Sequence, residues 1–371
     1  MTIGLVDLAR QRAAIEPRLT EAFARVAEHG AFIGGPEVAA LEAALAARVG
    51  IGHAVGCANG TDALQLLLRA AGIGAGDAVF VPSLTFVATV EAVMLAGAMP
   101  MLIDVDPATG TMCPNSLQRS LSEGASPGRP RAVIAVDLFS LPADHAGIGA
   151  LAAQHGLLHF VDAAHSIGTE TPAGACGSLA AASTTSFYPS KALGCYGDGG
   201  AVFIRDADLA ARLRAVANHG QSSGQVGQTL LGTNSRLDTI QAAILLEKLA
   251  IFDVEVAARR RIAARYQLDL APFCSLPAVA PGVRPVWSYF AIRHPRRDAL
   301  QAHLKARGIA SVAYYRVPTH AQPAYAELPV APGGLPITEA FAANLLCLPL
   351  HPYLTESEVD QVVAAVVEFG A

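Results

Sequence analysis

The sequence predicts an α/β fold, with a mostly parallel central sheet in a large domain and a smaller α/β domain at the C-terminal end. Two patterns predict it: short runs of β-forming residues alternate with helical runs over 53–220, and a long helical stretch then ends the alternation. A third observation is the length of 371 residues, which exceeds the size at which one hydrophobic core usually stops growing.

The alternation sets the elements expected in the large domain. Strands are expected at 53–58, 77–82, 99–106, 131–139, 157–165, 183–191 and 199–206, and helices at 61–72, 85–97, 114–122, 145–156 and 206–220. Because crossovers between parallel strands are right-handed, helices should cover both faces of the sheet. Ligands then bind at the carboxyl ends of the strands.

A helix that begins near Arg236 is long enough to form a strut between two domains. We place the domain boundary within it, which gives a large domain at 1–250 and a small domain at 251–371. The small domain should contain a strand at 287–293, a helix at 296–308, a strand near 311–315 and a final helix from Thr355.

Composition argues against several classes of protein. The net charge is −5, and the nearest approach to a basic cluster, ARRRIAAR at 258–265, is expected to be a solvated helix face, so a nucleic-acid partner is not expected. Apolar stretches are too short to span a bilayer and no export leader is recognisable, so we expect a cytoplasmic protein without a membrane partner. The six cysteines lack the spacing of a metal site.

Lysines are scarce, which narrows the places where a primary amine could act. The three are Lys191, Lys248 and Lys305. Lys248 and Lys305 lie in helical patterns whose charged positions should face water. Lys191 lies instead in SFYPSKALGCYGDGG, a segment of small residues, Pro and Gly that is typical of a functional loop, although an exposed loop lysine has the same appearance.

Several residues elsewhere could complete a site around this lysine. Asp162 ends an apolar strand, and a carboxylate there could pair with the ring nitrogen of a pyridine cofactor. His165 follows three residues later and could bind the phenolic oxygen of that ring. Gly60 and Thr61 begin a helix directly after a strand, where free N–H groups bind anions, unless they only form an ordinary cap. Further candidates are Ser186 for a phosphate and Phe86 for stacking, with an ordinary core position as the alternative for Phe86.

The sequence as a whole resembles the DegT/StrS-type nucleotide-sugar aminotransferases, a fold-type-I family that uses pyridoxal 5'-phosphate. The resemblance rests on FIGGPEV, CANGTDALQ, LTFVAT, VDAAHS, TSFYPSKALGCYGDGGA, GTNSRLDTIQAAILLEKL and CLPLHPYLT, in the family's order and spacing. It implies that Lys191 carries the cofactor as a Schiff base and acts as the catalytic base, with the cofactor cycling through pyridoxamine 5'-phosphate. It also gives roles at the cofactor to Asp162, His165, Phe86, Gly60, Thr61 and Ser186.

The resemblance further implies a homodimer with shared active sites. Asn234 would reach the phosphate held by the partner subunit. Arg236 would lie near the substrate, with a helix-start arginine tied to Asp238 as the alternative. Tyr314, Tyr315 and Arg316 occupy positions expected to contact the substrate.

The expected amino donor is L-glutamate, released as 2-oxoglutarate, and the expected acceptor is a keto nucleotide sugar. The motifs look closest to enzymes that aminate C3 of UDP-2-acetamido-2-deoxy-3-oxo-glucuronate. However, the loop at 221–231 lacks the basic and aromatic residues usual in that branch, so either Arg316 supplies the charge or the substrate lacks the uronate or the nucleotide. UDP-3-oxo-N-acetylglucosamine and a dTDP-3-oxo-6-deoxyhexose are alternatives. A sugar dehydratase or a non-catalytic regulator is disfavoured by the presence of Lys191.

Overall fold

The central sheet of the computed structural model, which describes residues 2–222 and 227–370, has seven strands in the order β1-β9-β8-β5-β4-β2-β3. Their bounds are β1 His53–Cys57, β2 Asp77–Pro82, β3 Met99–Ile103, β4 Arg129–Val136, β5 Leu158–Asp162, β8 Ala182–Ser186 and β9 Gly200–Ile204. Strand β9 is antiparallel to both neighbours and the remaining pairings are parallel. The predicted mostly parallel sheet is therefore confirmed.

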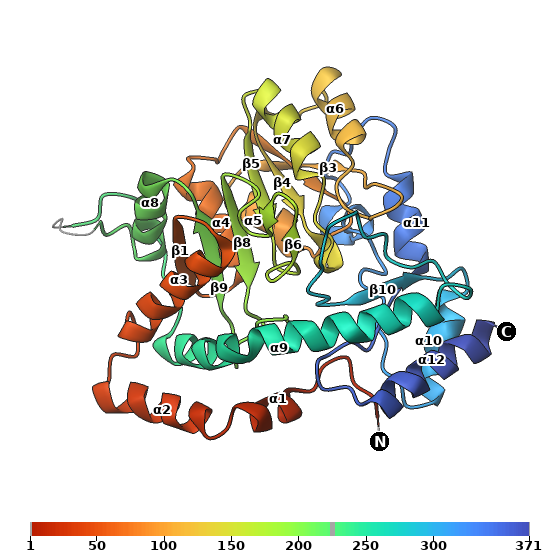
Figure 1. Cartoon of the computed structure of the whole chain (residues 1–371). Helices are drawn as coiled ribbons and strands as arrows, with labels where there is room; N and C mark the ends of the chain where they lie inside the picture. The colour runs from red at the N-terminus through yellow and green to blue at the C-terminus, as the bar shows by residue number, and fades with distance from the viewer. Residues whose placement is uncertain (1, 223–226, 371) are drawn as a thin grey trace.

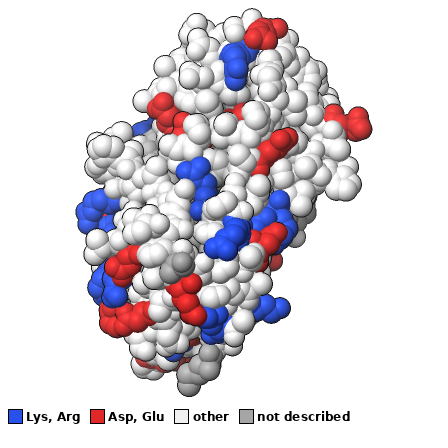
Figure 2. Space-filling view, turned by 90° about the vertical axis from the view of Figure 1, so that its right-hand side faces the viewer, with Lys and Arg blue, Asp and Glu red and all other residues white. Residues whose placement is uncertain are grey.

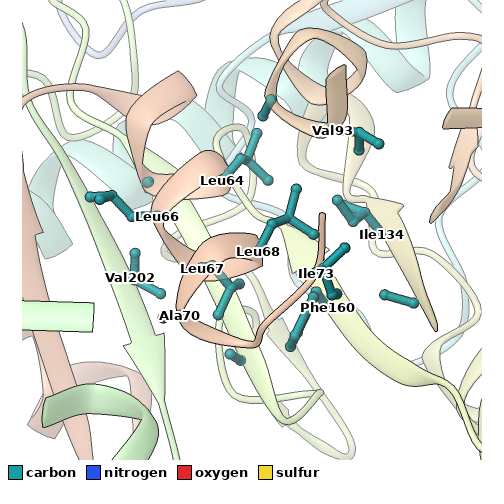
Figure 3. Packing of buried hydrophobic residues seen from close by; sticks show 14 of the residues in the cluster. Leu64, Leu66, Leu67, Leu68, Ala70, Ile73, Val93, Ile134, Phe160 and Val202 are labelled. Carbon is teal, nitrogen blue, oxygen red and sulfur yellow. The ribbon is translucent and has the colours of Figure 1, made fainter. Parts of the chain in front are cut away.

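Helices cover both faces of this sheet, as Figure 1 shows. On one face, α4 (Gly60–Ala70), α5 (Ala88–Leu95) and α8 (Ala207–Ala217) pack in a cluster with Phe160 and Val202 (Figure 3). The other face carries α3 (Pro36–Val49) and the long α9 (Thr239–Asp269) at one end, and α6 (Pro114–Ser122) and α7 (His145–Gln154) at the other. Successive strand residues serve opposite faces, since Phe160 and Val161 belong to different clusters.

The C-terminal part has a separate core. Strands β10 (Phe290–Arg293) and β11 (Leu345–Leu348) are antiparallel and pack with α10 (Arg297–Ala306), α12 (Glu356–Gly370) and the last turns of α9. Helix α11 (Pro336–Asn344) precedes β11. Ile3, near the start of the chain, joins this core by pairing with Ile309, while α1 (Leu8–Ile15) and α2 (Arg18–His29) run below α9 in Figure 1. The domain boundary at 250 falls inside the unbroken α9 and stays a prediction.

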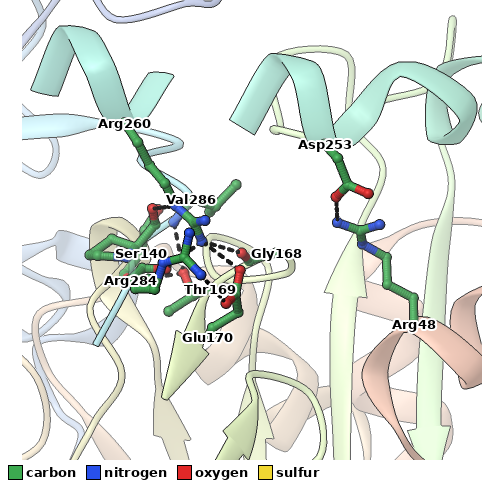
Figure 4. Close-up of polar contacts among 10 residues, drawn as sticks. Arg48, Ser140, Gly168, Thr169, Glu170, Asp253, Arg260, Arg284 and Val286 are labelled. Carbon is green, nitrogen blue, oxygen red and sulfur yellow. Dashed lines mark hydrogen bonds and ion pairs between the residues drawn. The ribbon is translucent and has the colours of Figure 1, made fainter. Parts of the chain in front are cut away.

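Ion pairs fix α9 against the large domain. In Figure 4, Arg48 of α3 pairs with Asp253, while Arg260 binds Glu170 at 3.0 Å and donates to the carbonyl oxygen of Gly168. Glu170 belongs to a pair of two-residue strands, β6 (Glu170–Thr171) and β7 (Gly174–Ala175). The helix is thereby joined to α3 and to the segment around Glu170 at two points along its length.

Three expectations about individual segments were wrong. Residues 311–315 form no strand, because only Val312 pairs, as a single bridge to Cys347. Lys248 is 1% exposed rather than facing water, and Arg259, in the stretch expected to be solvated, is also buried. Both lie on the one stripe of α9 that packs inward, where backbone oxygens accept their hydrogen bonds.

Figure 2 shows basic and acidic groups interspersed over one face of the molecule. Within residues 2–222 and 227–370, none of the helices combines the length and the apolar character needed to cross a bilayer.

Candidate active site

A cavity of about 630 Å³ opens at the carboxyl ends of β4, β5 and β8, where the sheet topology predicts a ligand site. Most of the residues predicted for the site line it: Gly60, Thr61, Phe86, Asp162, His165, Ser186, Lys191, Tyr314 and Tyr315. Segments far apart in the sequence thus supply one site.

Lys191 lies in the loop between β8 and β9, on the cavity wall. Its Nζ lies 5.9 Å from the centre of the Tyr289 ring. Burial lowers the pKa of the Lys191 amine to about 8, and the charge of Asp162 partly opposes the shift. A much larger fraction of this amine is therefore neutral near pH 8 than in an ordinary lysine, as a nucleophile or base requires.

This shift predicts a pH profile for the free protein. In competitive acetylation without cofactor, we expect Lys191 to label with a midpoint near pH 8. After denaturation the midpoint should move to the usual lysine value of about 10.4. Mass spectrometry can separate the three lysines of the chain. A midpoint at the usual value in the folded protein would contradict the buried environment of Lys191.

Asp162 is the last residue of β5 and is buried in the cavity wall. The Thr89 hydroxyl donates to Oδ2 at 2.8 Å and the Ala164 amide to Oδ1 at 3.1 Å. Burial raises the pKa of this carboxyl, whereas those two donors and the Lys191 charge favour its ionised form. A protonated ring nitrogen placed against Asp162 would stabilise the carboxylate further, and the carboxylate would in turn favour the protonated form of the ring nitrogen.

His165 is held as a neutral imidazole in a defined tautomer. The Phe139 amide donates to Nδ1 at 3.3 Å, so the ring proton is on Nε2. Burial and the Lys191 charge hold the pKa of His165 well below its usual range. Its neutral ring can therefore donate a hydrogen bond to an oxygen in the cavity.

The backbone around His165 is unusual and explains how that donor is placed. Phe139 and Ser140 adopt φ values of 52° and 73°, a region that residues with side chains rarely occupy. The Ser140 hydroxyl donates to the His165 carbonyl oxygen at 2.8 Å, and the Ser288 amide donates to Ser140 Oγ at 2.8 Å. These contacts hold the Phe139 amide against the imidazole, at the cost of local strain.

The amino-terminal end of α4 forms a further part of the cavity wall. Asn59 caps the helix by accepting from the Asp62 amide at 2.8 Å, and Gly60 and Thr61 follow at the cavity wall. A Cβ on Gly60 would lie 2.7 Å from the Ser186 Cβ, so only glycine fits there. A helix start beside a serine hydroxyl suits a phosphate group.

Aromatic rings form the remaining wall. Phe86 is 54% exposed and lies 6.0 Å from Tyr315, centre to centre, so the alternative of an ordinary core position is wrong. Tyr289 and Tyr314 lie edge to face at 5.4 Å. Such a wall could stack on a planar ring or a sugar face.

Three predicted residues lie outside this cavity. Asn234 and Arg236 line a neighbouring cavity of about 330 Å³ that shares Asp198 with the first. Arg236 donates to Asn218 Oδ1 at 3.1 Å, in place of the predicted alternative partner Asp238. Arg316 pairs with Asp298 at 2.9 Å on the small domain. Of the loop at 221–231, residues 223–226 lie outside the described residues.

Sequence reasoning missed the residues that orient the site and one aromatic residue of its wall. Thr89, Phe139, Ser140 and Ser288 carry no signal in type or spacing, because their roles depend on backbone conformation and on contacts between segments 25 to 148 residues apart. Tyr289 is part of the predicted strand at 287–293, where an aromatic residue is expected for packing alone.

A family model described as the DegT/DnrJ/EryC1/StrS aminotransferase family matches residues 13–367. The chain belongs to this family. The resemblance seen in the motifs is confirmed, and with it the assignment as an aminotransferase with a fold-type-I architecture.

Relatives of this family agree with the chain over nearly its full length. UDP-2-acetamido-2-deoxy-3-oxo-D-glucuronate aminotransferase of Pseudomonas aeruginosa is 40% identical, covering 98% of this chain and 99% of its own. dTDP-3-amino-3,4,6-trideoxy-α-D-glucose transaminase of Streptomyces venezuelae is also 40% identical, covering 99% and 96%. The crystal structure of a family aminotransferase from Brucella abortus superposes with a TM-score of 0.96 at 47% identity, covering 99% of both chains.

Proposed function

We propose that this aminotransferase holds pyridoxal 5'-phosphate on Lys191 and moves the amino group of L-glutamate to C3 of a 3-oxo nucleotide sugar. The observation that carries the proposal is one cavity with a partly neutral lysine, a buried carboxylate and a helix start at its walls. When bound, the cofactor supplies an electron sink for bonds broken at the substrate carbon. The cytoplasmic location predicted from the sequence is part of this proposal.

Each residue would have a distinct task at the cofactor. Asp162 would hold the ring nitrogen protonated, the His165 Nε2–H would bind the ring oxygen, and Phe86 would cover the ring face. Gly60, Thr61 and Ser186 would bind the phosphate. The Lys191 amine, displaced by glutamate, would move the α-proton of glutamate to the cofactor carbon that receives the nitrogen, and water would release 2-oxoglutarate. The reverse sequence would deliver the nitrogen to the sugar.

The leading acceptor is UDP-2-acetamido-2-deoxy-3-oxo-glucuronate. It is supported by the motifs and by the relative from Pseudomonas aeruginosa. A carboxylate on the sugar needs a cation, and Arg236, which lines the neighbouring cavity, could serve it.

A 3-oxo sugar without the carboxylate is the second candidate, and the position of Arg316 favours it. The guanidinium that could have supplied the missing charge pairs with Asp298, and no arginine is among the described residues that line the 630 Å³ cavity. The chain is equally identical, at 40%, to the Pseudomonas enzyme named for a UDP-linked uronate and to the Streptomyces enzyme named for a dTDP-linked sugar. Sequence identity therefore favours neither candidate.

The proposal is tested by supplying the purified holoprotein with glutamate and a panel of UDP- and dTDP-linked 3-oxo sugars, with and without the uronate carboxylate. Mass and NMR spectra of the product identify the accepted sugar and the aminated carbon, and the Lys191→Ala variant serves as the blank. We expect amination at C3. Amination at C4, or no product from any sugar, would contradict the substrate class, whereas a cofactor absorption change on adding glutamate alone tests the aminotransferase half separately.

We further propose that the protein is a homodimer in which Asn234 completes the partner's site. Within one chain Asn234 lies outside the cavity that contains Lys191. Exposed apolar side chains lie near by: Ile33 lines the same neighbouring cavity as Asn234, and Leu231, 89% exposed, precedes it closely in the chain. Such apolar exposure is typical of a surface that a partner covers.

A further inference from the structure

The loop that carries Lys191 is closed tightly on itself. The Cys195 amide donates to the Phe187 carbonyl oxygen at 2.7 Å, and the Lys191 amide donates to that of Tyr188 at 2.8 Å. At Gly194 a Cβ would lie 2.6 Å from the Tyr188 oxygen, so the two sides of the loop touch there. The position of Lys191 therefore depends on how the closing end of the loop, residues 194–196, is held.

Helix α9 holds that closing end from behind with two side chains. Lys248 Nζ donates to the Gly194 carbonyl oxygen at 2.6 Å and lies 4.0 Å from the centre of the Tyr196 ring. Gln241 accepts from the Tyr196 amide at 2.9 Å and donates to its carbonyl oxygen at 3.3 Å. Residues seven apart share one face of a helix, so both side chains come from the same side of α9.

A buried ammonium is a costly way to hold a carbonyl group, which makes this contact informative. Lys248 lies between Ile244 and Ile251 on α9, and those side chains pack with Ile15 and Leu19 of the N-terminal helical segment, which shield it from water. Burial lowers the pKa of Lys248 to about 8, while Glu255 on the same stripe of α9 favours its charged form. A purely apolar packing role would be filled more easily by methionine or leucine.

We propose that Lys248 is a positioning residue for Lys191: by holding the Gly194 carbonyl, its ammonium fixes the loop so that the Lys191 amine stays buried and aimed into the cavity. The effect of Lys248 on catalysis rests on the proposed function, in which Lys191 carries the cofactor. The effect of Lys248 on the burial of the Lys191 amine does not depend on that function, and it can be measured in the protein without cofactor.

The test uses Lys248→Met, which keeps the stem and removes the charge and the donor. Lys248→Arg is the conservative variant, and Lys305→Met is the matched control, since Lys305 is exposed on α10. In the free Lys248→Met protein, the midpoint of Lys191 acetylation should rise by roughly one pH unit or more, because a loosened loop exposes the amine to water. With added pyridoxal 5'-phosphate, the absorption band of the bound cofactor should form about tenfold more slowly. Lys248→Arg should restore most of both properties, and Lys305→Met should match the wild type.

A merely structural role would lower the melting temperature without moving the acetylation midpoint of the folded protein. The inference is overturned if Lys248→Met folds, labels Lys191 at the wild-type midpoint and binds the cofactor at the wild-type rate. Should that variant fail to fold, Lys248→Leu, which also removes the donor and the charge, is put to the same measurements and the same two outcomes apply. If the wild type itself forms no cofactor band, the proposed function fails, while the acetylation midpoints still decide the positioning role.

Discussion

Replacing Lys191 by alanine is expected to abolish amino transfer and leave the fold intact. By the proposed function, the variant would lose the group that binds the cofactor covalently and the base that moves the proton, and a positioned base alone contributes roughly 10²–10⁴-fold. Neither remaining lysine can substitute, since Lys248 is buried behind the loop on α9 and Lys305 lies on α10. Rapid-mixing measurements of the glutamate half-reaction, with Lys305→Ala as the control, would show the loss.

The same variant has a second expected effect, on stability without cofactor. The folded-state pKa of Lys191, about 8, lies below the unfolded value, so the unfolded chain binds more protons between pH 8 and about 10.4. The wild-type contribution is therefore unfavourable below pH 8 and improves as the pH rises through that window. Lys191→Ala should melt no lower than the wild type at pH 7. Retained steady-state turnover, or a collapse of the fold, would contradict this account of Lys191.

Mixing two inactive variants is expected to restore activity. If each site combines Lys191 of one subunit with Asn234 of the other, a hybrid of Lys191→Ala and Asn234→Asp chains has one wholly native site and one doubly altered site. Aspartate at 234 would repel the cofactor phosphate, so each variant alone should be inactive. Random exchange of subunits should then recover about a quarter of the wild-type rate.

The measurement is turnover after the two variants are dissociated together and reassembled, compared with each variant treated alone. If Asn234 acted in its own subunit's site, no hybrid would contain a native site and no activity would return. Mixing Lys191→Ala with Asp162→Asn serves as the control, since both residues line one cavity of one chain and no recovery is expected.

The sequence was sufficient for the sheet and for the walls of the site, and the reason is local. Asp162 ends a run of buried apolar residues and Gly60 follows a strand, so each could be placed at the carboxyl edge of the sheet from its neighbours alone. The burial of Lys248 and Arg259 could not be predicted in this way. Three parts of the chain pack on α9: the loop that carries Lys191, the N-terminal helices and the C-terminal part. A charged residue on such a helix resembles a solvated one until its partners are known.

Substrate contacts were the least predictable part. The side chains of Tyr314 and Tyr315 enter the cavity, whereas Arg316, the next residue, turns to Asp298. This difference arises from the path of the chain at 311–316. The sequence indicated a strand near 311–315, but this segment pairs only at Val312. An irregular segment has no side-chain period, so neighbouring residues cannot be assigned to a common face.

The single antiparallel strand of the sheet has a consequence for catalysis. A crossover between parallel strands starts at the carboxyl edge of the sheet, where the cavity lies, and ends at the opposite edge. Only one end of such a connection can therefore be anchored beside the cavity. The loop from β8 to β9 instead joins two antiparallel neighbours, and the Phe187 amide donates to the Gly199 carbonyl oxygen at 2.7 Å. Both ends of this loop are therefore anchored at the carboxyl edge. The residue expected to carry the cofactor thus lies in a loop whose two ends are both fixed to the sheet. Lys191 could therefore bind and release the cofactor without any movement of the sheet.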